Sequence, residues 1–144
     1  IFCFYLCTVM NNLRFATAVH ILVLLDKNQG ELITSDFIAG SINVNPVVVR
    51  REIKLLREAG LIEAKKGKIG GCALGVDASK ILLGNLYKIV NKENMLGRKN
   101  QPNPNCSVGR QINGKLDELF DQTDTTLIAT LNKQTLKDFS NQFD

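Results

Sequence analysis

The stretch VVVRREIKLLREAG, Val47 to Gly60, decides the fold because it has the pattern of a helix with two unlike faces. At about 100° per residue, one face gathers apolar side chains: Val48, Val49, Ile53, Leu55, Leu56 and Ala59. The opposite face gathers cations: Arg50, Arg51, Lys54 and Arg57. Asn45 and Pro46 supply a cap and a first-turn residue, and Gly60 is suited to end the helix. We therefore expect a helix packed on one side and cationic on the other, with Glu52 on the packed side and no partner evident.

The charge of the chain is concentrated around this helix. Residues 45–68 hold seven cations and three anions, an excess of four that equals the formal charge of the whole 144-residue chain, +4. The other residues are therefore neutral in sum. A basic excess confined to one segment favours a surface that faces a polyanion, whereas a merely solvated face is the simpler alternative.

The flanking segments predict two more helices and a hairpin. An apolar run at residues 13–25 indicates a central helix that ends in the turn at 27–30, and Thr34 can cap a short helix with Phe37, Ile38 and Ile42 facing inward. Residues 61–66 and 72–76 read as strands joined by a turn with lysines and glycines. Three helices followed by such a hairpin form the order of a winged helix-turn-helix, in which the third helix enters a major groove.

The second half of the chain reads as helical. We expect a helix from near Asp77 to Val90 and a polar loop at 91–105. A short helix is expected at 136–143, near the end of the chain. Between them a long helix from Ser107 has a row of residues at steps of three and four: Val108, Ile112, Leu116, Leu119, Thr123, Leu127 and Leu131. The row needs a partner, either its own amino-terminal lobe or a second copy of the chain. We favour a two-fold dimer.

The fold class is thus mainly α with a small β-hairpin wing, a winged helix-turn-helix plus a long dimerisation helix. We divide the chain into residues 1–9, an upstream leader or an apolar arm that docks on the body; residues 10–78, the DNA-binding domain; and residues 79–144, a helical sensor and dimerisation region. The leader is too short to span a bilayer, for which about 20 apolar residues are needed. We expect no membrane contact and a cytoplasmic protein.

Three stretches of the chain carry a family resemblance: MNNLRFATAVHILVLL, NPVVVRREIKLLREAGLIEAKKGKIGGCALGVDASKILLGNLYKIVN and CSVGRQINGKL. Together they resemble the IscR/NsrR/CymR (Rrf-two) family of bacterial winged-helix regulators. The resemblance covers essentially all of Met10 to Phe143. It implies a homodimeric transcription factor on a palindromic operator, often a repressor. It also implies DNA contacts for Asn45, Val47, Val48, Arg50, Arg51, Lys54, Lys66, Lys68, Gly70 and Gly71. Among them, Arg50 matches a position that touches base edges, and Arg51 and Lys54 are expected on phosphates.

The cysteines depart from one branch of this family. Members that carry an iron-sulfur cluster place three cysteines in the loop before the dimer helix, and this loop holds Cys106 alone. One thiolate per subunit does not hold a cluster, so we expect the cluster-free branch, with no cofactor and no metal. Cys106 precedes a helix start, which can lower a thiol pKa, and is a candidate redox sensor. A small-molecule signal, or no sensor at all, are the alternatives.

Other functional classes find little support in the residues. His20 lies in an apolar helix, where a satisfied core residue is the simpler reading, and no nucleophile motif or phosphate-binding loop is present in the sequence. We therefore predict that the protein is not an enzyme. The stronger alternative is a winged-helix module that binds protein in place of DNA.

Overall fold

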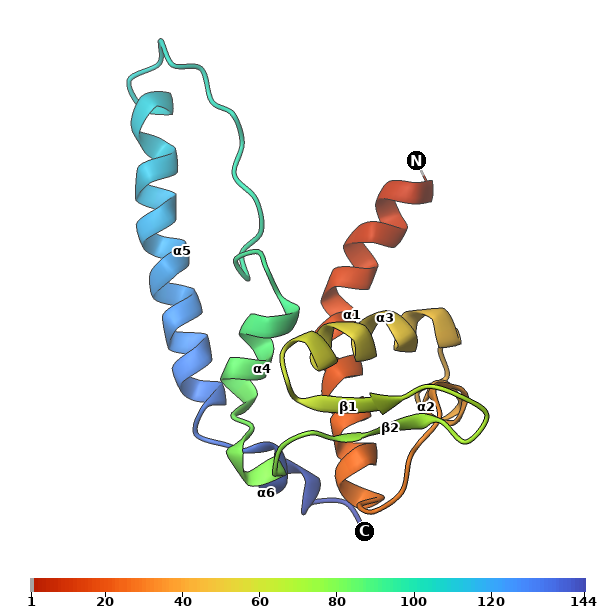
Figure 1. The fold of residues 1–144 in the computed structure, drawn as a ribbon. Coiled ribbons are helices and arrows are strands. Elements are labelled where there is room, and N and C mark those ends of the chain that lie inside the picture. Colours follow the sequence, from red (N-terminus) through yellow and green to blue (C-terminus); the bar gives the residue numbers. More distant parts are fainter. Residues whose placement is uncertain (1) are drawn as a thin grey trace.

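A long central helix, α1 (Phe2–Lys27), is the element on which most of the fold packs (Figure 1). The computed structural model describes the backbone of residues 2–144 and the side chains of residues 13–144. Within α1 the inward face is fully buried at Ala18, Ile21 and Leu22. The helix predicted at 13–25 is confirmed and continues to Lys27. The side chains of residues 1–9, where we expect a leader or a docking arm, are outside the described ones, and that expectation stays a prediction.

The helix-turn-helix follows from two caps that the sequence predicts. The Thr34 hydroxyl accepts a hydrogen bond from the Phe37 amide at 3.2 Å and starts α2 (Ser35–Ile42), and the Asn45 side chain accepts from Val47 at 2.9 Å and starts α3 (Pro46–Glu58). The inward position predicted for Phe37 is wrong, because its side chain is 57% exposed. The eight-residue α2 buries only a narrow face that contains Ile38, and a residue one step away points to solvent.

The wing is an antiparallel hairpin of β1 (Ile62–Lys65) and β2 (Gly71–Leu74), paired from Ile62↔Leu74 to Lys65↔Gly71. Ile33 adds a bridge to Cys72 on the other side of β2. Two glycines are required by this packing: a Cβ at Gly70 would lie 2.4 Å from the Lys65 carbonyl oxygen, and one at Gly71 would lie 2.9 Å from the Ile33 oxygen. The backbone of the protein itself therefore explains both glycines, and their contact with DNA stays a prediction.

The carboxyl-terminal half returns to the same core. It comprises η1 (Ala78–Lys80), α4 (Leu83–Val90), α5 (Gly109–Leu131) and α6 (Leu136–Ser140). The continuous helix predicted from Asp77 to Val90 is interrupted at Ile81 and Leu82, because the Leu136 amide donates to the Ile81 oxygen at 2.7 Å and Leu82 pairs with Thr135. Leu136 is fully buried in the cluster that also contains the inward face of α1.

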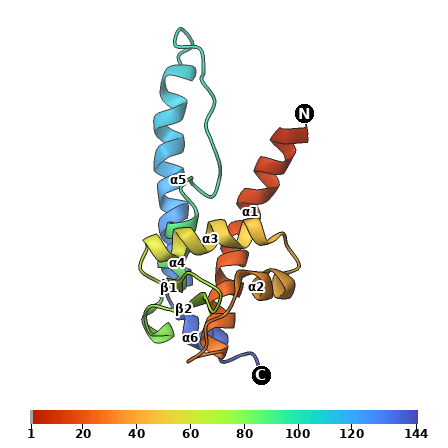
Figure 2. The same cartoon turned by 45° about the vertical axis from the view of Figure 1, so that its right-hand side comes forward.

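Helix α5 stands away from the body, accompanied by the loop at 91–108 (Figures 1 and 2). Among its 23 residues Phe120 is the buried one. The loop is tied to the helix: the Met95 amide donates to Asp124 at 3.0 Å, the Asn113 side chain donates to the Asn100 oxygen at 3.0 Å, and Lys99 pairs with Asp117. The acids of α5 thus hold the loop as well as facing solvent.

None of the helices in the described part of the chain is both long enough and apolar enough to cross a bilayer.

Candidate nucleic-acid interface

The amino-terminal turns of α3 present the side chains predicted to face a major groove. Val47 is exposed and Val48 is half-buried, while Val49 behind them is fully buried and holds the helix on the core. Arg50 points out of this end: its Nε donates to the Ser35 hydroxyl at 3.2 Å, and its Nη2 lies 3.2 Å from an Asp36 carboxylate oxygen. The side chain of Arg50 remains 58% exposed.

The next two cations of α3 also have acidic partners. Arg51 Nε lies 3.5 Å from Glu52 Oε1, and Lys54 Nζ lies 4.0 Å from Glu58 one turn later. Both side chains are exposed, as contacts with phosphates require.

Glu52 has a partner that the sequence did not reveal. Arg14 of α1 donates to it twice, from Nε to Oε1 at 2.9 Å and from Nη2 to Oε2 at 3.2 Å. The Glu52 side chain is 1% exposed and that of Arg14 is 23% exposed. A carboxylate buried this deeply needs a paired cation, and the forked guanidinium matches its two oxygens. This ion pair joins α3 to the central helix.

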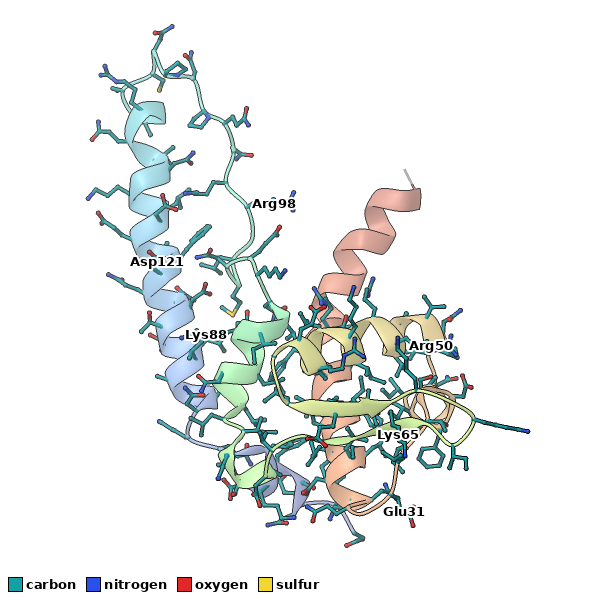
Figure 3. All side chains as sticks on the ribbon, in the orientation of Figure 1. Glu31, Arg50, Lys65, Lys88, Arg98 and Asp121 are labelled. Carbon is teal, nitrogen blue, oxygen red and sulfur yellow. The ribbon has the colours of Figure 1, made fainter. Side chains whose placement is uncertain are left out.

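The wing adds Lys65, Lys66 and Lys68, all exposed. None of the ion pairs found among residues 13–144 involves these three lysines. In Figure 3 the labelled side chains Arg50 and Lys65 lie on the side of the molecule toward which the hairpin turn projects. We refer to the exposed cations of the amino-terminal end of α3 and of the wing, which lie on the same side of the molecule in this view, as the basic face. The opposite face of α3 is buried.

Cys106 lies apart from this face, just before the start of α5, at the end of that helix remote from the hairpin (Figure 1). Its thiol is exposed, and hydrogen bonds from the backbone amides of Gly109 and Val108 lower its pKa below the ordinary value. Cys72 is the opposite case: burial raises the pKa of its thiol to about 11, and the thiol donates to the Ile33 oxygen at 3.3 Å. Cys72 is therefore a packing residue.

The described residues do not fit a metal or an iron-sulfur cluster. Across residues 13–144 no group of three or more histidine, cysteine, aspartate or glutamate side chains is placed to hold a metal ion. His20 Nε2 lies 3.1 Å from the Ser41 hydroxyl, so the ring has a protein partner. The side chains of Cys3 and Cys7 are not among those that the structure describes.

Reasoning from the sequence missed three residues that contact the charged side chains of α3: Arg14, Ser35 and Asp36. One signal for Arg14 was present, since an acid in the apolar arc of a helix requires a cation, and Arg14 interrupts the apolar face of the central helix. Ser35 and Asp36 had no comparable signal, because polar residues in the first turn of a helix are common for local reasons.

Known proteins resemble the chain over nearly its whole length. The family Rrf2, described as "Iron-dependent Transcriptional regulator", matches residues 12–142. YwnA of Bacillus subtilis (strain 168), named as an HTH-type transcriptional regulator, is 39% identical over 133 residues, 92% of this chain and 98% of YwnA.

Two solved structures give the same fold. One, described as a transcriptional regulator from Lactobacillus plantarum, superimposes with a TM-score of 0.78 at 25% identity and covers 90% of this chain and 88% of that one. Another, described as a DNA-binding protein, superimposes with a TM-score of 0.70 at 36% identity and covers 88% of this chain and 97% of that one. These relatives are regulators and not enzymes, and the chain belongs to the Rrf2 family of transcriptional regulators, with the winged-helix fold of that family.

Proposed function

We propose that the protein is a sequence-specific DNA-binding repressor that acts in the cytoplasm as a homodimer on a palindromic operator. The observation that supports this most is the single basic face made by the amino-terminal end of α3 and the wing, opposite a buried apolar face of the same helix. Arg50 reads base edges, and Arg51, Lys54, Lys66 and Lys68 hold phosphates, with Asn45, Val47, Val48, Gly70 and Gly71 shaping the surface between them.

The dimer in this proposal forms through α5. Val108, Ile112 and Leu119 follow one another at spacings of four and seven, at the start of α5 and along it, and all three stay exposed when the described residues of the single chain are considered. A second copy buries the row and sets two recognition helices at a fixed separation. Leu119→Glu should turn the dimer into a monomer in sedimentation velocity and weaken operator binding, whereas Glu118→Gln beside it should leave both unchanged.

The signal in this proposal is an oxidant that acts on Cys106. Its thiolate attacks hydrogen peroxide, the O–O bond breaks, hydroxide leaves, and the sulfur is oxidised by two electrons to a sulfenic acid. The lowered pKa and the exposure of the thiol favour this reaction, and the buried Cys72 serves as the unreactive comparison. Peroxide should change operator affinity in the parent protein and not in Cys106→Ser. Equal responses of the two proteins would remove the thiol from the proposal.

Salt dependence separates DNA binding from the alternative, a winged-helix module that binds protein. The DNA is first selected from a random duplex pool, and its affinity is then measured by fluorescence anisotropy from about 50 to about 200 mM salt. The logarithm of affinity should fall against the logarithm of salt with a slope of about −0.9 for each phosphate held. A flat response, or no selected sequence, would favour the protein-binding module.

Two variants distinguish base contacts from phosphate contacts. Arg50→Ala should lose roughly 1–3 kcal/mol of discrimination at one base pair in each half-site. Lys68→Ala should weaken binding to all sequences alike and reduce the salt slope by about 1. Lys115→Ala on α5 removes the same charge outside the basic face and should do neither.

A further inference from the structure

The contact between α2 and Arg50 suggests a role for Asp36 that no part of the proposed function assigns. Ser35 and Asp36 are the first two residues of α2, and both touch the guanidinium of Arg50 across the helix-turn-helix. The distances are 3.2 Å from Nε to the Ser35 hydroxyl and 3.2 Å from Nη2 to the Asp36 carboxylate. Two neighbouring side chains therefore hold one cation that the surface would otherwise leave free to rotate.

Stability does not explain this arrangement. The side chain of Arg50 is 58% exposed and that of Asp36 is 73% exposed, and ion pairs as exposed as this contribute little to folding. Thr34, and not Asp36, caps α2, because its hydroxyl accepts the hydrogen bond from the Phe37 amide. An acid in the first turn of a helix is common for local reasons. Beside a surface that faces phosphates, however, it also weakens DNA binding by repulsion.

The contacts with Ser35 and Asp36 leave one edge of the Arg50 guanidinium open for a base. A guanidinium has five N–H donors, and the contacts to Ser35 and Asp36 use two of them, which leaves three. The two donors in use come from Nε and Nη2, along one edge of the planar group. The edge between Nη1 and Nη2 stays open, and a pair of donors there matches the two acceptors that guanine presents in the major groove.

We propose that Asp36, together with Ser35, is a positioning residue that fixes the guanidinium plane of Arg50 so that it selects guanine. A free arginine side chain loses rotamer freedom on binding and can adapt to other acceptors, whereas one that is already oriented loses less and discriminates more. This inference rests on the proposed function, since it assumes that Arg50 reads a base. It adds the source of the selectivity and the identity of the base.

The test compares two variants that remove one negative charge each. Asp36→Asn removes the partner of Arg50, and Glu58→Gln removes the exposed partner of Lys54 on α3, at 4.0 Å. The full chain is titrated at one salt concentration against two operator duplexes. They carry guanine or adenine at the base pair for which Arg50→Ala abolishes the base preference. Asp36→Asn should reduce the guanine preference roughly two- to tenfold, and Glu58→Gln should leave it unchanged.

A double variant shows whether Asp36 acts through the arginine. Arg50→Ala with Asp36→Asn should have the same base preference as Arg50→Ala alone. Thermal unfolding of each variant accompanies the titrations, because a loss of fold would lower affinity for both duplexes equally and leave their ratio intact. Ser35→Ala should act in the same direction as Asp36→Asn by a smaller factor.

Three results overturn the inference. In the first, Asp36→Asn behaves like Glu58→Gln, so that Asp36 is only a charge. In the second, Asp36→Asn changes the base preference in the Arg50→Ala background, so that the carboxylate acts without the arginine. In the third, binding to DNA depends on salt but shows no preference between guanine and adenine at the tested pair. The protein would then bind DNA without reading that base. The absence of salt-dependent binding is a different result, since it rejects the proposed function itself.

Discussion

Two ion pairs, each with a buried carboxylate, join α1 to its neighbours. Helix α1 supplies the cation in one pair and the carboxylate in the other. At one point, Arg14 of α1 receives the Glu52 carboxylate from the recognition helix α3; twelve residues later, Asp26 of α1 receives Lys137 from α6. Each carboxylate side chain is 1% exposed, but Arg14 is 23% exposed and Lys137 is 41% exposed. The two sites lie about 18 Å apart along the helix.

The difference lies in the cation. Arg14 offers two N–H groups of a rigid fork, one to each oxygen of Glu52, whereas Lys137 places a single nitrogen 3.2 Å from both oxygens of Asp26. A fork fixes orientation, and a point charge fixes only distance. Asp26 receives a further hydrogen bond from the Gln29 side chain at 2.8 Å. The junction with α3 is thus the oriented one, as suits a helix that must present its cations in one direction.

Removal of the oriented cation should have the largest effect. Arg14→Met leaves the Glu52 carboxylate buried with Arg51 alone within ion-pairing distance, and we expect the free energy of unfolding in urea to fall by about 3 kcal/mol. Because α3 is released from α1, operator affinity should fall as well.

The matched control removes both charges. Arg14→Met with Glu52→Leu leaves no buried charge unpaired, so most of the lost stability should return. If the double variant were as unstable as Arg14→Met, the loss would come from packing of the arginine stem and not from the stranded carboxylate.

Removal of the lysine should have a smaller effect that depends on pH. Burial raises the pKa of Asp26, but the hydrogen bonds from Lys137 and Gln29, with the nearby Ser140 hydroxyl, outweigh this effect and hold the pKa below the ordinary 3.8. A depressed pKa stabilises the fold at pH values above 3.8, and this contribution is lost as the pH falls through the folded value. Lys137→Met should therefore cost about 1–2 kcal/mol at neutral pH and progressively less below pH 3.8.

Lys115→Met provides the comparison on an exposed pair. Lys115 and Glu118 are both largely exposed, at 3.3 Å, and the substitution should change stability by less than about 0.5 kcal/mol. A pH dependence of Lys115→Met as large as that of Lys137→Met would show that net charge, and not the buried Asp26, is responsible.

These junctions also mark the limit of prediction from the sequence. The caps at Thr34 and Asn45 and the hairpin turn were predictable because their hydrogen bonds join residues three or fewer positions apart, or belong to one turn. The break at Ile81 was not predictable, because its cause is Leu136, far along the chain. The pattern of a single segment contains no information about such a partner.

The candidate site divides in the same way. That Arg50 and Arg51 lie on the open face of α3 follows from the periodicity of the stretch that contains them. What each guanidinium touches does not, because Asp36 lies 14 positions away in the sequence, and the contact arises only when α2 packs on α3. Arg14 and Glu52 are 38 positions apart.

Substitutions that keep the cation separate the effect of orientation from that of charge at the two junctions. Arg14→Lys keeps the cation but loses one of two hydrogen bonds to Glu52, and should cost about 1 kcal/mol in urea unfolding. Lys137→Arg keeps the cation at Asp26, where one nitrogen already serves both oxygens, and should change stability by less than about 0.5 kcal/mol. Because a lysine at position 14 no longer fixes the angle of α3, operator affinity should also fall in Arg14→Lys and not in Lys137→Arg. Equal stability and equal affinity of the two variants would mean that charge alone holds both junctions, and that the fork at Glu52 does not orient the recognition helix.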